Sequence, residues 1–273
     1  MENKSETSKP YQFTGSIPAH YDQYLGPLFF EPYAEEVAER ISGIQINTAL
    51  ELAAGTGRVT KHLRRALPQN ARLIASDVSA EMLEIAKEKL EGEKVEWRII
   101  DLNDLPFEDN SIDLIVCCFG YMFATDKVKA YSEALRVLKN GGMLLIATWD
   151  RLSAIGASNV YRQVVKKYLP DPPPASFGLP FSMHDEEQIK NDIQEAGFSA
   201  IRIERVQKLS TSDTAKNAAI SLSQGGTIYN EIMKINPAAV DEIKEEVEKQ
   251  LTEKYGVAPM VAPMSALITQ AWK

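Results

Sequence analysis

The feature that most constrains this chain is a short apolar segment that ends in a turn of small residues. Thr48-Ala-Leu-Glu-Leu52 has the composition of a buried strand, and Ala53-Ala-Gly-Thr-Gly57 follows it directly. Small side chains and glycines let a backbone come close to a ligand, and the helix after such a turn directs free N–H groups toward it. The pattern predicts a strand, a ligand-binding turn and a helix. The alternative is a tight connection that uses glycine for steric reasons alone.

The residues around the turn argue against a dinucleotide and against nicotinamide-dependent oxidoreduction. A pyrophosphate fingerprint needs glycines in the pattern G-x-G-x-x-G, and Ala53, Gly55 and Arg58 occupy those positions here. Glu51 precedes the turn and could accept hydrogen bonds from a cationic amino group, and Asp77 could accept from both hydroxyls of a ribose. These groups suit a ligand with a carboxylate, an ammonium group and a ribose but no phosphate. S-adenosylmethionine is such a ligand.

Apolar segments and amphipathic segments alternate along the chain. Strands are predicted at 48–52, 72–77, 95–101, 112–120, 143–149, 200–206 and 265–272. Asp126 opens an amphipathic helix that is expected to end in a left-handed cap at Asn140-Gly-Gly142. Near-continuous apolar strands that alternate with helices indicate a sheet covered on both faces. The expected fold is therefore α/β, with a Rossmann-like sheet of seven mostly parallel strands.

The segments outside this alternation are expected to be helical additions. Residues 1–10 are interpreted as a flexible polar tail, and residues 11–45 as N-terminal cap helices. The cofactor-binding domain would comprise 46–207 and 263–273, and residues 208–262 would form a helical insertion. A glycine pair in the insertion permits hinge motion, so the insertion is a candidate substrate lid.

Capping residues and breakers predict four further helices. A helix is expected near 153–169, and another at Ser182, with Asp185 as its capping-box partner. The insertion should hold one polar helix over 212–234 and a second helix capped by Asn236, whose apolar stripe would dock on the protein body.

With these elements in order, the chain resembles the class I S-adenosylmethionine-dependent methyltransferases. The matching segments are Glu51–Gly57, Ser76–Leu83, Asp101–Phe107, Ser111–Val116 and Leu135–Gly142, and 119–127 looks most like the ubiquinone/menaquinone C-methyltransferase group. The resemblance spans residues 20–150 in the family's order. It implies S-adenosylmethionine as cofactor and an in-line transfer of its methyl group to oxygen, nitrogen or carbon of a small-molecule acceptor.

The resemblance also implies residue roles. Asp77 should take the ribose, Val78 and Met82 should border the adenine, and Asp101 with Leu102 should contact the adenine edge, although Asp101 alone would read as a solvated strand-end carboxylate. The expected cofactor-binding residues are Tyr24, Glu51, Ala53, Ala54, Gly55, Thr56, Gly57, Asp77, Val78, Met82, Asp101, Leu102 and Cys118.

No general base stands out. His20, Tyr21 and Tyr121 are the catalytic candidates, and Tyr21 or Tyr24 could instead close over the cofactor. His62 lies in a basic run that reads as a solvated helix face. His184 reads as a structural residue, and Cys118 as a packing residue rather than a nucleophile. No residue spacing suggests a metal site. The lack of a base leaves open a second function, that of a non-catalytic or regulatory protein that binds S-adenosylmethionine or S-adenosylhomocysteine.

Charge and composition narrow the partners. The net charge of −8 in 273 residues disfavours nucleic acid, which needs a basic face. Cys117 and Cys118 are neighbours on a predicted strand, so they point to opposite faces and read as reduced thiols of a cytoplasmic protein. No segment has the character of a membrane span or a signal peptide. The expected partner is a small-molecule methyl acceptor, and the oligomeric state is left open.

Overall fold

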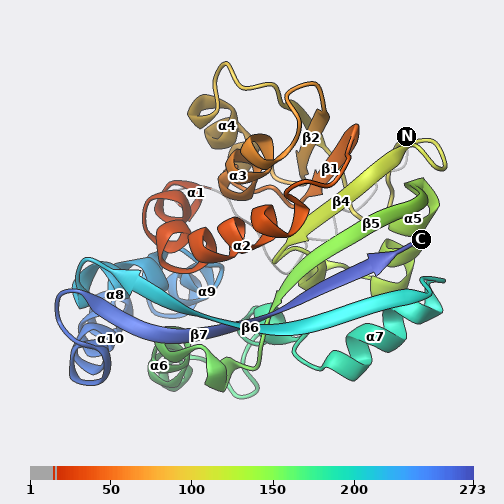
Figure 1. The fold of residues 1–273 in the computed structure, drawn as a ribbon. Coiled ribbons are helices and arrows are strands. Elements are labelled where there is room, and N and C mark those ends of the chain that lie inside the picture. The colour runs from red at the N-terminus through yellow and green to blue at the C-terminus, as the bar shows by residue number, and fades with distance from the viewer. Residues whose placement is uncertain (1–14, 16) are drawn as a thin grey trace, which may run out of the picture.

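A seven-stranded sheet forms the centre of the computed structural model, which describes residue 15 and residues 17–273 (Figure 1). The expected tail at 1–10, and residues 11–14 and 16 of the cap segment, lie outside the described residues. The strands are β1 (Thr48–Leu52), β2 (Arg72–Asp77), β3 (Glu96–Ile99), β4 (Ile112–Cys118), β5 (Leu138–Trp149), β6 (Ala200–Ser212) and β7 (Met260–Trp272). Their order is β3-β2-β1-β4-β5-β7-β6. The predicted α/β fold is thereby confirmed.

The strand order reverses beside β1, and this positions the site. Strands β1 to β5 are parallel, whereas β7 runs antiparallel to both β5 and β6. Leu52, the last residue of β1, lies opposite Ser76 on β2 and Cys117 on β4. Ligands of open parallel sheets bind outside the carboxyl ends of the strands, where the strand order switches. The residues that follow these three positions therefore share the edge where a ligand is expected.

Helices cover both sides of the sheet, with α2 and α3 to the left of the strands in Figure 1 and α5 and α7 to the right. The α-helices are α1 (Ile17–His20), α2 (Glu31–Ile41), α3 (Arg58–Ala66), α4 (Ala80–Lys89), α5 (Lys127–Val137), α6 (Gly156–Val165), α7 (Glu186–Glu195), α8 (Ala215–Gln224), α9 (Ile228–Ile235) and α10 (Ala239–Tyr255). Short 3₁₀ turns are η2 (Tyr121–Phe123), η3 (Leu152–Ala154), η4 (Lys166–Tyr168), η5 (Ala175–Phe177) and η6 (Leu179–Phe181). No helix of the described residues combines the length and the apolarity needed to cross a bilayer.

The N-terminal cap continues into a wide helix, η1 (Tyr21–Phe30), and then into α2. Glu31 donates its backbone N–H to the carbonyl of Gly26, five residues back, as in a π-helix. Tyr33, Val37 and Ile41 of α2 are fully buried against the core. The cap is therefore anchored to the sheet through α2.

Strands β6 and β7 form a ribbon that is longer than the sequence pattern indicated. Their pairing runs from Ala200 opposite Trp272 to Ser212 opposite Met260, so the insertion comprises 213–259 rather than 208–262. Pro263 lies within β7, although a proline cannot donate a hydrogen bond to a neighbouring strand. It is tolerated because β7 pairs with β5 only from Ala266 onward, which leaves the other edge of β7 unpaired at Pro263.

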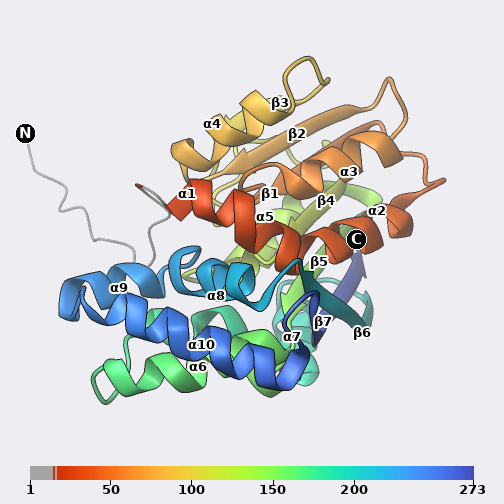
Figure 2. The same cartoon turned by 90° about the vertical axis from the view of Figure 1, so that its left-hand side faces the viewer.

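The insertion helices form a separate group with α6. Figures 1 and 2 show α6, α8, α9 and α10 gathered at the far end of the β6–β7 ribbon, away from α3 and α4. The predicted polar helix over 212–234 is two helices, α8 and α9, because the pair Gly225-Gly226 interrupts it. Ile243, Val247 and Leu251 of α10 are buried, as the predicted apolar stripe required.

Three helix boundaries differ from the sequence expectation. Helix α5 ends at Val137 rather than at the glycines, because Leu138 turns to extended backbone, is fully buried and pairs with Ile112 of β4. Asp185, not Ser182, caps α7, since its carboxylate accepts from two backbone N–H groups of the first turn. Helix α10 begins at Ala239 without a side-chain cap, so the capping expected of Asn236 is wrong.

Candidate active site

A cavity of about 750 Å³ lies at the carboxyl ends of β1, β2 and β4. Its size is that of a typical small-molecule site. The sheet contributes Ala53, Asp77 and Cys118 to its lining, each directly after one of the three positions that are paired across the strands. Helices η1 and α6 and the insertion add further parts of the wall, with Leu25, Arg162 and Leu222 among their residues. Segments far apart in the sequence thus enclose one space.

The turn after β1 has an unusual backbone. Ala53, Gly55 and Gly57 all have positive φ angles, of 55°, 55° and 78°. Phe119, at the end of β4, has a φ of 59°. Left-handed backbone is strained for residues that carry a Cβ, and such strain persists where the surrounding structure fixes it, often at functional sites. Ala53 and Phe119 both line the cavity, so the strain is concentrated around it.

Asp77 fastens the turn to the end of β2. Its Oδ2 atom accepts a hydrogen bond from the N–H of Gly55 at 2.8 Å, and its Oδ1 atom accepts from the N–H of Ser79 at 2.9 Å. Burial raises the pKa of this carboxyl group, and the backbone hydrogen bonds from Ser79 and Gly55 oppose that rise. Each carboxylate oxygen has a second lone pair, so Asp77 can accept further hydrogen bonds from a ligand.

The predicted cofactor-binding residues divide into two sets. Ala53, Gly55, Asp77, Val78, Met82, Asp101, Leu102 and Cys118 line the cavity. Tyr24, Glu51, Ala54, Thr56 and Gly57 do not line it. For Gly57 the structure gives a packing reason, because a Cβ there would lie 3.0 Å from the Cβ of Ala86 on α4. Glycine at this position lets α3 and α4 approach each other. Gly57 thus has the steric role that the sequence analysis offered as the alternative to ligand binding.

Glu51 is buried beside the turn, and its Oε2 atom has no hydrogen-bond partner within the described part of the chain. Burial raises the pKa of Glu51 from 4.5 to about 8. A buried acid in this state is held protonated near neutral pH. A neighbouring ammonium group would favour the ionised form and would supply the donor that Oε2 lacks.

This raised pKa predicts how stability depends on pH. Between pH 4.5 and about 8 the folded protein holds a proton on Glu51 that the unfolded chain releases. The stability of the wild type relative to Glu51→Gln should therefore fall as the pH rises through that interval. Urea denaturation of both proteins at pH 5, 6, 7 and 8 measures this difference in the free energy of unfolding. Parallel stability curves for the two proteins would show that Glu51 ionises normally.

An aromatic cluster forms one wall of the cavity, and the sequence analysis did not anticipate it. Phe119 stacks on Trp149 with 4.0 Å between ring centroids, and Phe30 contacts both rings at 5.2 and 5.7 Å. All three residues line the cavity. Phe119 and Trp149 lie at the ends of β4 and β5. Their positions at strand ends were the feature of the sequence from which this cluster could have been predicted. The wall suits an apolar or planar group.

The three catalytic candidates differ in their position relative to the cavity. Tyr21 lines the cavity and stacks on Phe30 at 5.2 Å, but burial raises the pKa of its hydroxyl well above the usual value. Tyr121 is fully buried against Tyr131 at 4.7 Å and does not line the cavity. His20 stacks on Tyr24 at 6.1 Å, also outside the lining. Only Tyr21 of the three candidates is positioned to touch a ligand.

The two cysteines are both free thiols. Cys118 lines the cavity, and burial raises the pKa of its thiol well above the usual value. Because the thiolate is the nucleophilic form, this environment does not favour covalent catalysis by Cys118. Its place in the lining is consistent with the packing role expected from the sequence.

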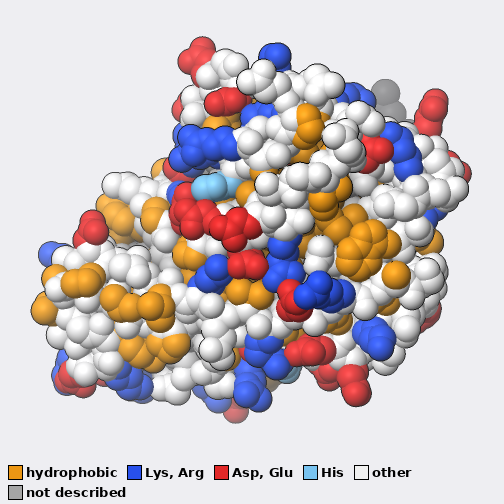
Figure 3. All heavy atoms as spheres, viewed as in Figure 1, with side chains coloured by type: hydrophobic (Ala, Val, Ile, Leu, Met, Phe, Trp, Pro, Cys, Tyr) orange, Lys and Arg blue, Asp and Glu red, His pale blue; other side chains and the backbone are white. Residues whose placement is uncertain are grey.

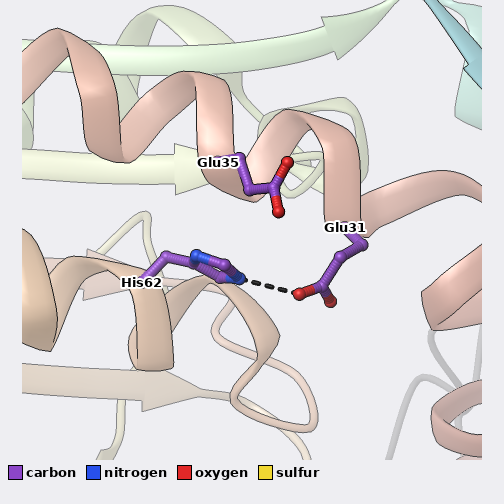
Figure 4. A group of neighbouring side chains, drawn as sticks. All are labelled: Glu31, Glu35 and His62. Carbon is purple, nitrogen blue, oxygen red and sulfur yellow. Dashed lines mark hydrogen bonds and ion pairs between the residues drawn. The ribbon is translucent and has the colours of Figure 1, made fainter.

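His62 is not on a solvated face, contrary to the sequence expectation. Its side chain is 14% exposed, and its Nε2 atom lies 2.8 Å from Oε1 of Glu31. Figure 4 shows Glu31 and Glu35 of α2 directed toward His62 of α3. Arg58 forms a second ion pair with Glu31. Helix α2 thus packs on α3 through charged groups that lie far apart in the sequence.

The same group brings together atoms that could ligate a metal, which no residue spacing had suggested. The candidate ligand atoms of Glu31, Glu35 and His62 lie within 4.8 Å of one another. Burial opposes the ionisation of Glu31, but hydrogen bonds from His62 and Arg58 outweigh it and lower its pKa. Arg58 already supplies a cation to this carboxylate, so we interpret the group as an ion-pair network between helices.

The surface around this network mixes both signs of charge. Figure 3 shows acidic and basic side chains side by side on this face, next to a histidine. Glu36 pairs with Arg40 and Lys208, and Arg40 pairs also with Glu204, so charged residues of α2 and β6 are joined. On this face the basic side chains pair with acids rather than forming a continuous basic strip.

Residues 49–142 match the family described as a methyltransferase domain. The ubiquinone/menaquinone biosynthesis C-methyltransferase of Francisella tularensis subsp. novicida is 36% identical over 128 residues, which cover 45% of this chain and 51% of that protein. The chain thus spans about half the length of this curated relative. The protein of the same name from Hydrogenovibrio crunogenus is 30% identical over 176 residues, which cover 59% of this chain and 69% of that protein.

A solved structure shares the fold across most of the chain. The phosphoethanolamine N-methyltransferase 2 of Haemonchus contortus, in complex with S-adenosyl-L-methionine, superposes with a TM-score of 0.61 at 17% identity. The match covers 96% of this chain and 58% of that one. At this identity the likeness concerns the fold alone, and it includes the sheet with its helical layers.

Proposed function

Because the chain belongs to the class I S-adenosylmethionine-dependent methyltransferases, we propose that it transfers the methyl group of S-adenosylmethionine to a small-molecule acceptor. The observation that carries the proposal is the cavity at the carboxyl ends of β1, β2 and β4, in which Asp77 holds the glycine turn. The proposal covers transfer to oxygen, nitrogen or carbon. Relatives named as C-methyltransferases favour carbon.

The residues around the turn fit this cofactor. A Cβ built on Gly55 would meet only one neighbouring atom within 4 Å, Cε of Met82 at 3.6 Å, so space for a ligand lies beside the backbone. Glu51 has a buried oxygen without a donor close to the same turn, and the ammonium group of the cofactor would be that donor. Asp77 would accept from the ribose hydroxyls, while Val78 and Asp101 would lie along the adenine.

The chain's own contribution to the reaction is mainly positioning. When bound, the cofactor supplies a methyl group that its sulfonium already activates, so an acceptor held in line needs little further chemistry. Phe119 and Trp149 would hold the acceptor and exclude water at the ends of β4 and β5. Tyr21 would remain protonated beside them and could donate a hydrogen bond.

A second candidate function is non-catalytic binding of S-adenosylmethionine or S-adenosylhomocysteine, as in a regulatory protein. None of the three histidines, all of which the structure describes, lines the cavity. Tyr21 and Cys118 line it but are held in their neutral forms. An acceptor that needs deprotonation would find no base among these groups.

Two measurements test the proposal. Calorimetry against S-adenosylmethionine, S-adenosylhomocysteine and NAD should give binding of the first two only. Formation of S-adenosylhomocysteine from S-adenosylmethionine should then depend on an acceptor from a metabolite library. Binding without any acceptor-dependent turnover would favour the regulatory protein, and tight NAD binding would refute the proposal.

We also propose that the insertion acts as a lid. Leu222 of α8 and Ile228 of α9 line the cavity, and so does Leu25 of η1, whose Cβ atom lies 3.2 Å from a Cβ built on Gly225 at the end of α8. Lids belong to the less stable parts of a fold and become ordered with ligand. Hydrogen exchange should therefore slow in 215–235 and in η1 when S-adenosylhomocysteine is added. Protection confined to the glycine turn would refute the lid.

We propose a cytoplasmic location and a small-molecule acceptor from the cysteines and the net charge. Cys117 and Cys118 are adjacent free thiols, as expected of a cytoplasmic protein. The net charge of −8 supports a small-molecule acceptor over a nucleic acid.

A further inference from the structure

Arg162 is a buried cation in the wall of the cavity. It lies on α6, is 8% exposed and lines the cavity together with Ser158 and Tyr161 of the same helix. The acidic lining residues Asp77, Glu81 and Asp101 lie at or after the ends of β2 and β3, whereas α6 follows β5. In the sheet order β3-β2-β1-β4-β5, the acids and Arg162 therefore belong to opposite sides of β1 and β4.

The protein provides few partners for this cation. Arg162 donates one hydrogen bond to the carbonyl of Phe177, and its guanidinium lies 4.9 and 5.2 Å from the ring centroids of Phe177 and Phe181. No carboxylate of the described residues forms an ion pair with it. A guanidinium has five N–H donors, and a buried charge is costly unless it is paired. Burial accordingly lowers the pKa of Arg162 to about 10.

Arg64 shows how this fold treats a buried arginine whose role is structural. It is 9% exposed and donates to four backbone carbonyls, at Leu67, Pro68, Ala71 and Lys94. Arg64 does not line the cavity. The contrast in partners at equal burial indicates that Arg162 is satisfied by something other than the protein.

The neighbours of Arg162 add donors rather than acids. Burial raises the pKa of Tyr161 to about 12, so its hydroxyl keeps its proton near neutral pH. Ser158 places a second hydroxyl on the same face of α6. A cation with two hydroxyl donors fits a carboxylate, which a guanidinium can bind through two parallel hydrogen bonds. Phe181 and Trp149 make the surrounding wall apolar.

We propose that Arg162, assisted by Ser158 and Tyr161, binds the carboxylate of an apolar methyl acceptor. The inference rests on the proposed function and names the class of its acceptor. It assigns to α6 the recognition of the acceptor, whereas the turn after β1 recognises the cofactor. Arg162 is a specificity-determining residue in this assignment.

The test compares acids with their uncharged isosteres. Calorimetry with cinnamate and octanoate, against cinnamamide and octanamide, is run on the wild type in the presence and absence of S-adenosylhomocysteine. We expect at least one acid to bind about 10-fold or more tightly than its amide. Equal affinities for acid and amide, or binding of neither, would overturn the inference. This comparison needs no variant to fold.

Variants then assign the preference to Arg162. Arg162→Gln can still donate to the carbonyl of Phe177 but lacks the charge, so the acid should bind no better than the amide. Lys166→Gln removes an exposed charge one turn further along the same helical segment and should keep the preference. An acid preference that survives Arg162→Gln in a protein with an unchanged melt would overturn the assignment.

The two proposals fail in different ways. S-adenosylhomocysteine affinity should be the same in wild type, Arg162→Gln and Lys166→Gln, because α6 does not contribute to the cofactor side. A wild type that does not bind S-adenosylhomocysteine would refute the proposed function. A wild type that binds S-adenosylhomocysteine without discriminating acid from amide would refute only the role of Arg162.

Discussion

Replacement of Asp77 by alanine should weaken the binding of S-adenosylhomocysteine by about 100-fold or more, because hydrogen bonds to a charged group contribute roughly 1.5–3 kcal/mol each. The carboxylate accepts from the N–H groups of Gly55 and Ser79 and is the ribose acceptor in the proposed function. Alanine removes both the ligand contacts and the bonds that fix the turn. Calorimetry with the wild type and the variant measures the loss.

Asp185 provides a matched control for this prediction. Its carboxylate also accepts from two backbone N–H groups, those of Glu187 and Gln188, but it caps α7 and does not line the cavity. Asp185→Ala should lower the melting temperature and leave the affinity unchanged. If Asp77→Ala and Asp185→Ala bind S-adenosylhomocysteine equally well, Asp77 has only a structural role.

Valine at Gly55 should abolish detectable cofactor binding. The side chain would extend into the space beside the turn, where Cε of Met82 is the one neighbouring atom within 4 Å of the added Cβ. It would also force a β-branched residue into left-handed backbone at a φ of 55°, which costs about 1–2 kcal/mol. The melting temperature should therefore fall by several degrees while unfolding stays cooperative.

Gly43 separates the two effects of that substitution. It has a φ of 78° and no atom within 4 Å of an added Cβ, and it does not line the cavity. Gly43→Val should show a similar loss of stability with full S-adenosylhomocysteine affinity. Normal binding by Gly55→Val would instead mean that the turn is only a connection between β1 and α3.

The sheet could be predicted from the sequence because its determinants are local. The strand ending at Leu52 and the one ending at Asp77 are short segments with an apolar centre, and each is followed by residues typical of a turn. Asp126 was recognised as a helix cap, and it does accept from the N–H of Lys129. Such local patterns predict a strand or a helix end without any knowledge of the tertiary contacts.

What the sequence did not predict depends on distant partners. His62 sits in a run of basic residues, and only the packing of α2 on α3 reveals Glu31 beside it. Leu138 leaves the helix because it pairs with Ile112, which no local pattern specifies. The capping pattern at Ser182 was locally plausible, but the carboxylate of Asp185 provides the better acceptors.

The candidate site divides in the same way. The proposed cofactor side consists of consecutive residues at the ends of β1 and β2, and these carry a recognisable motif. The proposed acceptor side is assembled from single residues, such as Phe30, Trp149 and Arg162, which belong to separate elements. A lone arginine within an apolar helical segment, Val160-Tyr-Arg-Gln-Val164, was the one available signal for the cation.

The ribbon of β6 and β7 bears on how this protein could be re-engineered. Ser212 and Met260 are paired across it, so the 213–259 segment leaves and rejoins the fold at one rung of hydrogen-bonded backbone. The two attachment points are held roughly 5 Å apart by strand geometry, whatever lies between them. A helical module from another protein with similarly close ends could be transplanted onto this rung. The part of the cavity wall that the insertion supplies could thus be exchanged as a cassette, while Arg162 and the glycine turn stay in place.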